Sequence, residues 1–523
     1  MKNIFFLIFV ILNCSCNSIK FVNEYSFLNN PTSNSLTDNI NLQNWHNLDP
    51  ETDSIPGTSV ERAYDELLNG LKGKKVIVAV IDTGLDIDHL SLSNNIWINK
   101  DEKLNGKDDD KNGYIDDIYG WNYLGTSYNE TRDMTRILRD NQVDNIKYSL
   151  VEEEIRKEIK KSNEQLNILN YYIQILEFSK GVISENLDNT KFTIEDVNKI
   201  KTEDEKLNRA KNIYIDFESI GYTKEYLNEG IEQYNDFINY HFNIDFNGRT
   251  SNDNIYDIND TDYGDSNINN IKDSESHSTH VSGIISGDRN NKKGNKGINN
   301  LVEIMALRAI PNGDEYDKDV ARAIRYAVDN GAKIINGSFG KYFSSNPEWV
   351  IDAIRYASKK DVLVVAAAGN ESKDLDLLSN DNYPNDQFFN KNEFSDTFIK
   401  VGASTINLNE NFTAYFSNYG KINVDIFAPG VDIYSSVPND KYKFQDGTSM
   451  ASPVVSGIAS LIMSYFPKLS AKKVKEIILK SGIDIDLKIG NLGSNKHFRE
   501  YSKSGKLINA YNALILASKS KRE

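Results

Sequence analysis

Three short polar segments, far apart in the chain, contain the residue types that acid–base and nucleophilic chemistry requires. Asp82 ends an apolar run in "VIDTG", His277 and His280 lie in "SHSTHVSG", and Ser449 lies in "DGTSMASP" just before a long apolar stretch. A serine hydroxyl is a poor nucleophile until a neighbouring imidazole accepts its proton. Together the three segments therefore contain the parts of an activated serine.

Each segment also has a simpler interpretation when it is taken alone. An aspartate at a strand end is commonly a turn or N-cap residue, and Ser449 has the position of a helix N-cap. His277 and His280 have a spacing that would suit two zinc ligands, although no third ligand pattern lies nearby. Only the combination favours catalysis.

In combination, the order Asp, His, Ser and the motif "GTSMASP" resemble the subtilisin-like serine proteases, the S8 peptidases. The resemblance covers roughly residues 55–126 and 245–515. It implies that Ser449 attacks a peptide carbonyl, that His277 is the general base and that Asp82 fixes the tautomer of His277. One departure is Ser278, since the family usually has glycine after the histidine.

The resemblance also assigns the group that stabilises the developing negative charge. The segment "VVAAAGNES" ends an apolar run with Gly369 and Asn370. By resemblance, the side-chain amide of Asn370 and the backbone N–H of Ser449 form the oxyanion hole. The alternative is that Asn370 is only a turn residue.

Substrate binding is assigned in the same way, to the segment "NGSFG". By resemblance, Ser338, Phe339 and Gly340 run beside the peptide as an edge strand, with Gly340 leaving room for it, and Gly369 lines the pocket for the residue before the cut. Since main-chain pairing reads extended shape, we expect broad specificity.

Outside these motifs, strand-like and helix-like segments alternate. The apolar run 76–81 is rich in β-branched residues, and further strands are predicted within 302–310, 332–340, 362–370 and 398–404. Helices are predicted within 317–331 and 346–360, and within 59–70 with Ser59 as N-cap. This order predicts an α/β fold, and the resemblance specifies a three-layer subtilisin-like fold with a mostly parallel sheet. Active residues then collect where strands end.

A different composition, highly charged and without proline, separates the first two motifs. Apolar residues from Val151 to Leu176 recur at three- and four-residue steps, which predicts a long amphipathic helix. Further helices are predicted to start at Thr193 and at Thr202, the latter with Glu205 in a capping box. We interpret residues 127–244 as an all-α insertion, a hairpin or small bundle that shades the cleft or recruits a partner. The alternative is a solvated helix without a partner.

An acidic segment, "DDDKNGYIDD", predicts a cation site. Side chains of Asp108, Asp110, Asn112 and Asp116, with the carbonyl of Tyr114, match the spacing of a calcium loop, although its twelfth position is not glutamate. Related proteases often carry a similar loop, so structural Ca²⁺ is expected. A solvated acidic turn is the alternative. The acidic stretch 245–273 is a second, less regular candidate.

The chain opens with "MKNIFFLIFVILNCSCNS", which has the length and charge of a signal peptide. It resembles a bacterial lipoprotein signal that ends at Cys16, with Cys14 as the second choice and plain secretion as the alternative. Both readings predict export to the cell envelope or beyond, and a mature chain without disulfides. The predicted segments are signal 1–16, polar leader 17–57, catalytic parts 58–126 and 245–520, and insertion 127–244.

A net charge of −16 argues against nucleic acid as a partner, because phosphate binding requires a basic surface. Protein or peptide substrates are therefore expected. The leading hypothesis is a serine endopeptidase that acts through an acyl-enzyme, in either a broad or a client-selective form. The other hypothesis is an inactive surface-binding protein on the same scaffold.

Overall fold

A large, mostly parallel β-sheet forms the centre of the computed structural model, which describes residues 42–140, 145–291, 294–387, 392–490 and 496–520. Its strands pair in parallel, except the antiparallel edge pair β10 and β13. In spatial order they are β10 (Ile483–Asp484), β13 (Lys506–Leu507), β7 (Ile426–Pro429), β6 (Phe398–Ser404), β5 (Leu363–Ala367), β4 (Ile334–Gly337), β1 (Val76–Asp82), β3 (Val302–Arg308) and β2 (Gly120–Asn122). The parallel sheet is as predicted.

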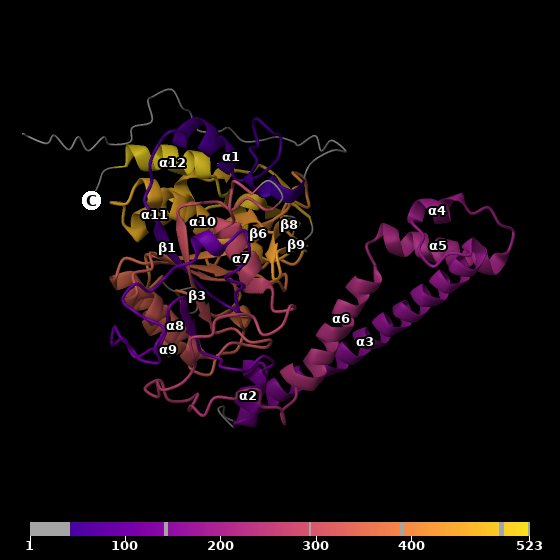
Figure 1. Ribbon diagram of the computed structural model, residues 1–523, viewed down its shortest axis with the longest axis horizontal. Coiled ribbons are helices and arrows are strands. Elements are labelled where there is room, and N and C mark those ends of the chain that lie inside the picture. The colour runs from indigo at the N-terminus through magenta and orange to yellow at the C-terminus, as the bar shows by residue number, and fades with distance from the viewer. Residues whose placement is uncertain (1–41, 141–144, 292–293, 388–391, 491–495, 521–523) are drawn as a thin grey trace, which may run out of the picture.

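Alternate residues of the strands face two separate apolar cores. In β1, Val78 and Val80 pack into the core on one face, whereas Ala79 and Ile81 pack into the core on the other. Because both faces are buried, the strand must be apolar throughout, as its sequence is. The three layers of an α/β fold result (Figure 1).

Helices cover both faces of this sheet (Figure 1). One face carries α7 (His277–Ser286), α10 (Thr448–Tyr465), α11 (Ala471–Ser481) and α12 (Ala510–Lys519), and the other carries α8 (Asp317–Asp329) and α9 (Pro347–Lys359). Strands β3 to β6 and helices α8 and α9 lie within the predicted ranges. Two small antiparallel pairs, β8 (Ile433–Val437) with β9 (Lys441–Gln445) and β11 (Lys488–Ile489) with β12 (Lys496–His497), complete the strands.

A helical arm, α2 to α6, lies between β2 and α7. Figure 1 shows α3 and α6 running side by side away from the sheet, with α4 and α5 at the far end. Leu176, Leu207 and Leu227 belong to a small apolar core between α3, α5 and α6, so the predicted helices have partners. The helices are α2 (Asp133–Arg139), α3 (Asn145–Leu187), α4 (Ile194–Lys199), α5 (Glu205–Ser219) and α6 (Lys224–Asp236).

The caps of these helices are only partly as predicted. Thr193 caps α4 in a reciprocal capping box with Asp196. The expected cap at Thr202 is wrong, because α5 begins later and the carboxylate of Asp204 accepts from the N–H of Leu207. Thr202 instead accepts a hydrogen bond from the N–H of Asp204. Aspartate and threonine are both good caps, so the sequence alone does not choose between them.

The described end of the predicted leader, residues 42–57, packs onto the α/β core instead of forming an extended tether. Trp45 is fully buried and donates from Nε1 to the carbonyl oxygens of Val431 and Asp432, at 3.2 and 3.1 Å. Asn47 donates to the carbonyl of Lys296 (2.9 Å). A single tryptophan buries enough apolar surface to anchor a polar segment, which an average over composition hides.

Ser59, the predicted N-cap of the helix that follows the leader, does not cap it. The backbone of Ser59 is left-handed and its side chain makes no cap bond to α1 (Val60–Arg62). Its hydroxyl accepts from Asn509 instead (2.6 Å). A π-helical turn, Ala63–Leu68, continues α1.

None of the helices in the described ranges combines the length and apolarity needed to cross a bilayer.

Candidate active site

Asp82 and His277 meet at the carboxyl end of β1. Asp82 is the last residue of the strand, and His277 is the first residue of α7. The two side chains form a hydrogen bond between His277 Nδ1 and Asp82 Oδ1 of 2.7 Å, and their exposed fractions are 33% and 2%. Burial disfavours the charged imidazole, but the charge and hydrogen bond of Asp82 outweigh it, so the pKa of His277 lies above its usual value.

A buried ion pair holds the turn that carries His277. The side chain of Arg308, at the end of β3, contacts Glu275 at 2.8 Å, and both side chains are almost completely buried. Glu275 also accepts the N–H of Gly84, two residues after Asp82 (2.8 Å). Glu275 thus joins the two turns that carry Asp82 and His277. Sequence reasoning missed it, since its only signal was an acidic residue just before the histidine motif.

Ser449 lies in the first turn of α10, against the end of β4. Within the described part of the chain, its hydroxyl has one hydrogen bond, which it donates to the carbonyl of Ser338 (2.9 Å). In return, the hydroxyl of Ser338 donates to the carbonyl of Ser449 (2.9 Å). That carbonyl has no helical partner, because Pro453 lacks the N–H that would reach it. The proline therefore frees the carbonyl that fixes α10 to the Ser338 segment.

The start of α10 approaches α7 through the preceding hairpin. Gln445, the last residue of β9, donates from its side chain to the hydroxyl of Ser276 (3.3 Å). Ser276 directly precedes His277. The structure thus pairs Asp82 with His277 directly, and brings Ser449 to the same end of the sheet through its neighbours.

Asn370 is oriented by the residue before Ser449. Its Oδ1 accepts two hydrogen bonds from Thr448, one from the backbone N–H and one from the hydroxyl, each 2.9 Å. The Thr448 hydroxyl also accepts the N–H of Gly369 (3.0 Å). With Oδ1 committed to donors, the Nδ2 amide hydrogens of the exposed Asn370 face away from Thr448. Thr448 lies within the "GTS" motif, but sequence reasoning missed its role in positioning Asn370.

Gly369 occupies a position that only glycine fits. Its φ is +100°, and a Cβ there would lie 2.4 Å from Nδ2 of Asn418 and 2.9 Å from a carboxylate oxygen of Glu371. Glu371 accepts from the hydroxyl of Tyr342 and, at 3.0 Å, from Asn418. A polar cluster therefore lies against Gly369 where the sequence predicted a plain pocket wall.

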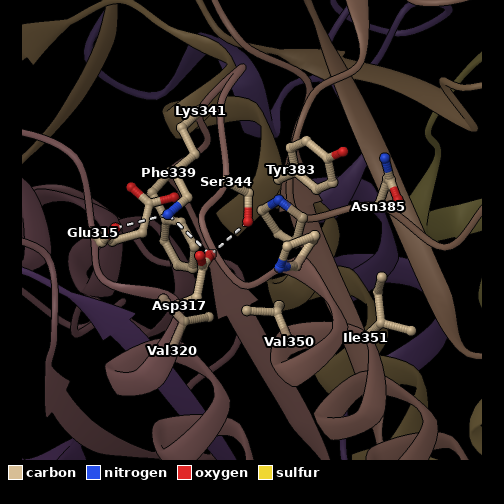
Figure 2. A pocket seen from close by; sticks show the side chains of 12 residues that line it. Glu315, Asp317, Val320, Phe339, Lys341, Ser344, Val350, Ile351, Tyr383 and Asn385 are labelled. Atoms are coloured by element: carbon tan, nitrogen blue, oxygen red, sulfur yellow. Dashed lines mark hydrogen bonds and ion pairs between the residues drawn. The ribbon is translucent and has the colours of Figure 1, made fainter. Parts of the chain in front are cut away.

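Side chains of the predicted substrate segment alternate between two environments. The hydroxyl of Ser338 contacts the hydroxyl of Ser452 in α10. Phe339 lines a small pocket (Figure 2) and packs against the core that contains α8 and α9. The predicted room at Gly340 is taken by the chain itself, because a Cβ there would meet the carbonyl of Tyr383 at 3.0 Å. The next residue, Lys341, pairs with Tyr383 in an antiparallel bridge. Gly340 thus admits a neighbouring segment of this protein.

Lys341 is the charged centre of the small pocket. Figure 2 shows its ammonium group reaching toward Asp317 and Glu315. The contacts are 2.9 Å to Asp317 Oδ1, 2.9 Å to the carbonyl of Glu315 and 2.7 Å to Asp133 Oδ2. Asp133 belongs to α2, so the base of the helical arm is fixed to the residue after the substrate segment.

His280 does not join His277 in a metal site. Its Nε2 contacts the carbonyl of Lys443 in β9 at 3.0 Å, and burial lowers its pKa to about 3. Nδ1 of His277 is already paired with Asp82. The two imidazoles therefore serve different neighbours, and the zinc interpretation gains no support.

Carboxylates of the acidic loop gather in a grouping that differs from the predicted one. Ligand oxygens of Glu102, Asp108 and Asp110 all lie within 4.8 Å of one another. Asn112 instead bonds Asp110, Asp117 and the N–H of Tyr114, while Asp116 accepts the N–H groups of Asn105 and Gly106. The side chain of Tyr114 packs on Trp121 and Tyr326. Glu102 was missed because it precedes the motif.

Cys14 and Cys16, the predicted lipidation candidates, lie outside the described residues. Ser278, which stands where the family usually has glycine, belongs to the described residues and is buried. Its backbone N–H donates to the hydroxyl of Thr83 (3.1 Å), so the serine side chain is accommodated beside the turn that follows Asp82.

Comparisons with known proteins identify the family of the chain. Residues 73–502 match the model of the subtilase family, Peptidase S8. The chain is 36% identical over 261 residues to the thermophilic serine proteinase of Bacillus sp. (strain AK1), covering 50% of this chain and 55% of that protein.

Two further relatives match over shorter lengths. The cell wall-associated protease of Bacillus subtilis (strain 168) is 35% identical over 234 residues, covering 45% of this chain and 24% of that protein. Thermitase of Thermoactinomyces vulgaris is 36% identical over 189 residues, covering 36% and 61%. The chain thus spans about half or less of the length of the first two relatives. The family match covers most of the chain, which therefore belongs to the subtilase family.

Proposed function

We propose that this protein is a serine endopeptidase that hydrolyses peptide bonds through an acyl-enzyme. Ser449 is the nucleophile, His277 the general base and Asp82 the residue that orients His277. The observation that carries the proposal is the 2.7 Å hydrogen bond between His277 Nδ1 and a buried carboxylate, at the sheet end where Ser449 opens α10. Membership of the subtilase family supports it.

The first half of the reaction forms the acyl-enzyme. Because Nδ1 of His277 faces Asp82, its proton stays there and Nε2 is left as the base. The hydroxyl of Ser449 rotates away from Ser338, Oγ bonds to the substrate carbonyl carbon, and its proton passes to Nε2. The C–N bond then breaks, and Nε2 returns the proton to the departing amine.

Two donors stabilise the oxyanion of each tetrahedral intermediate, the Nδ2 amide of Asn370 and the backbone N–H of Ser449. Thr448 supports this role, because it holds Oδ1 of Asn370 and so turns Nδ2 the other way. The N-terminus of α10 adds a favourable dipole. In the second half, water attacks the acyl carbon and gives a proton to Nε2 of His277. The bond between the acyl carbon and Oγ then breaks, Nε2 returns that proton to Oγ of Ser449, and the carboxylic acid product leaves.

The substrate backbone runs along Ser338 and Phe339, and the residue before the cut packs beside Gly369. The hydrogen bonds between Ser338 and Ser449 support this assignment, since they keep the segment next to the nucleophile. Main-chain pairing of this kind accepts many sequences.

A structural Ca²⁺ is proposed at Glu102, Asp108 and Asp110, with Asn112, Tyr114 and Asp116 shaping the loop. Three carboxylates within 4.8 Å provide the hard oxygen ligands that Ca²⁺ prefers. No lysine or arginine forms an ion pair with any of them among the described residues, so their charge is left for a cation. Chelation should lower the melting temperature, and Asp108→Asn should abolish that response. An unchanged melting temperature would remove the site.

We also propose that the chain is exported and that Cys16, or else Cys14, carries a lipid anchor. The signal-like opening supports export, as does the similarity to a protease named as cell wall-associated. Labelling with a radioactive fatty acid in the native host, comparing Cys16→Ser with Cys14→Ser, tests the anchor.

A serine-directed fluorophosphonate tests the proposed activity. The wild-type chain should be labelled at Ser449, and the variants Ser449→Ala and His277→Ala should not, while all three keep the same circular-dichroism spectrum. Absence of labelling in a correctly folded wild-type protein would favour the inactive binding protein instead.

A further inference from the structure

Two buried histidines outside the proposed triad contact the same strand, β9. Nε2 of His280 lies 3.0 Å from the carbonyl oxygen of Lys443, and Nε2 of His89 lies 3.2 Å from that of Lys441. Both histidines are at most 1% exposed. Lys441 and Lys443 are two positions apart in the strand, so their carbonyls point to the same side of β9. The two imidazoles therefore hold one side of this strand.

The partners of these rings determine which ring nitrogen carries the proton. A carbonyl oxygen only accepts hydrogen bonds, so Nε2 of each histidine must be the donor. In His89, Nδ1 accepts the backbone N–H of Ser91 (3.0 Å), as this tautomer requires. In His280, burial lowers the pKa to about 3, so the ring is neutral. Both histidines thus act as neutral N–H donors to β9.

The position of β9 in the chain makes these two contacts relevant to catalysis. The strand ends four residues before Ser449. His280 lies one turn after His277 in α7, and His89 lies seven residues after Asp82, which ends β1. β9 is therefore tied to the two segments that carry the other members of the proposed triad.

The other strand of the hairpin, β8, docks on the same helix. The hydroxyl of Ser435 donates to the carbonyl of His280 (2.8 Å), and the hydroxyl of Ser436 donates to the carbonyl of Thr279 (3.0 Å). Gly283 allows this close approach, because a Cβ there would overlap both serine hydroxyls. The hairpin is thus bonded to α7 through both of its strands.

The proposed base and nucleophile are held by different elements. Ser449 donates its hydroxyl hydrogen to the carbonyl of Ser338 (2.9 Å) and not to His277, so no direct bond sets their separation in the described chain. The hairpin links their two helices, because it is bonded to α7 and leads into α10. At the end of β9, Gln445 adds a bond to Ser276, the residue before His277 (3.3 Å). The placement of the hairpin therefore contributes to the separation between base and nucleophile.

We propose that His280 and His89 are positioning residues that hold the β8–β9 hairpin, and with it Ser449, at the distance from His277 that proton transfer requires. Neither of the two touches the substrate or exchanges a proton in the reaction. A misplacement of about 1 Å between reacting groups costs about a hundredfold in rate, so the loss of a buried donor that fixes this distance should be measurable. The inference rests on the proposed endopeptidase activity.

Replacing His280 with leucine removes the N–H donor and leaves an apolar side chain in its place. We expect kcat to fall by about a hundredfold while KM changes by less than about twofold, because the misplaced groups act on the transition state and not on bound substrate. His280→Gln offers an amide N–H in place of Nε2–H and should recover most of that loss. Steady-state kinetics on a quenched peptide, with the full-length protein below the melting temperature of each variant, measure both constants.

The matched control is His46→Leu. It removes another fully buried imidazole, whose ring nitrogens have no hydrogen bond to a described residue, and it should keep the wild-type kcat. Equal losses of kcat in His46→Leu and His280→Leu would mean that any buried imidazole has this effect, and would overturn the proposal.

The pH profile of kcat/KM separates positioning from an effect on the charge of His277. His280→Leu should leave the midpoint in place, because the hydrogen bond between Asp82 and His277 remains. A shifted midpoint would show that His280 acts on the protonation of His277, and would contradict a purely positioning role.

The remaining outcomes also decide the matter. Wild-type kcat in a folded His280→Leu variant, or equal losses in His280→Leu and His280→Gln, would overturn the proposal and leave the endopeptidase intact. Should His280→Leu fail to fold, His89→Leu and His89→Gln test the contact with Lys441, with the same expected difference between leucine and glutamine. No cleavage by the wild-type chain, together with no labelling of Ser449 by the fluorophosphonate, would instead refute the proposed activity, and the positioning role with it.

Discussion

At the scale of single residues, the neighbours of the reacting groups decide which atom does what. Thr448 fixes the carboxamide of Asn370, and Asp82 fixes the ring of His277. Asn370 and His277 are thus each oriented by a residue that is distant in sequence, 78 and 195 positions away. Two predictions belong to this scale.

Replacing Asn370 with alanine removes one oxyanion donor. We expect kcat to fall by about a hundred- to a thousand-fold with little change in KM, because the amide acts on the transition state and not on bound substrate. Steady-state kinetics on a quenched peptide measure both constants. The control is Asn380→Ala, in a surface turn away from the site. A large rise in KM with unchanged kcat would contradict the assigned role.

The pH dependence of activity should report His277. Since Asp82 holds the pKa of His277 above its usual value of 6.5, the base is protonated and inactive below that pKa. Activity should therefore rise with pH through a midpoint above 6.5. Asp82→Asn removes the charge, so the midpoint should move down and kcat should fall by about ten-thousand-fold. The measurement is kcat/KM from pH 5 to 9, and a midpoint that Asp82→Asn leaves in place would contradict the assignment.

At the scale of elements, the base of the helical arm is tied to the substrate segment. Asp133 of α2 contacts Lys341 and Arg136 and accepts the N–H of Ser345, all in a buried environment. The pKa of Asp133 is lowered to about 2, because Lys341 and Arg136 outweigh the effect of burial. The base of the arm is therefore anchored beside the substrate segment, although most of the arm projects away from the α/β core (Figure 1).

Asp133→Asn should disturb the cleft as well as the fold. Removing one partner of a buried ion pair costs about 3–5 kcal/mol of unfolding free energy, because the remaining charge stays buried. Since Lys341 follows the substrate segment, KM should rise while the fluorophosphonate still labels Ser449. Urea unfolding and peptide kinetics measure the two effects. The matched control, Asp352→Asn, breaks the exposed pair with Arg355 (3.1 Å) and should change neither quantity.

At the scale of the whole molecule, three buried histidines outside the proposed triad have lowered pKa values. His46 is buried in the N-terminal segment and His241 at the base of the arm, while His280 contacts the carbonyl of Lys443 in the hairpin β8–β9. Burial lowers their pKa values to about 3, 4 and 3 respectively. In the unfolded chain each would titrate near 6.5, so these residues take up protons only on unfolding as the pH falls below that value.

Stability should therefore decrease between pH 6.5 and pH 5. Each of these three histidines lowers the unfolding free energy at pH 5 by at most about 2 kcal/mol. This value follows from about 1.36 kcal/mol per pH unit over the interval from pH 6.5 to pH 5. Urea unfolding of the Ser449→Ala background, which cannot digest itself under the proposed mechanism, measures this loss. His46→Leu should reduce the pH dependence by one proton, and equal stability at both pH values would refute the explanation.

The amino-acid sequence alone was sufficient to predict the strands β3 to β6 and helices α8 and α9. Doubly buried strands and amphipathic helices have local signatures that leave few alternatives. The motifs around Asp82, His277, Ser449 and Asn370 were equally readable, since the family resemblance depends on short contiguous segments. Thr193 as a cap belongs with them, because a capping box lies within four residues.

Only the tertiary structure decided the contacts between distant segments. Glu275 with Arg308, Lys341 with Asp133, and Glu102 with Asp108 join residues whose spacing in sequence has no regular pattern. The same is true of Trp45, which buries a segment of polar composition, and of Gly340, which accommodates Tyr383. Local propensity fixes what each segment becomes, but ion pairs and close packing form only after the folded chain brings those segments together.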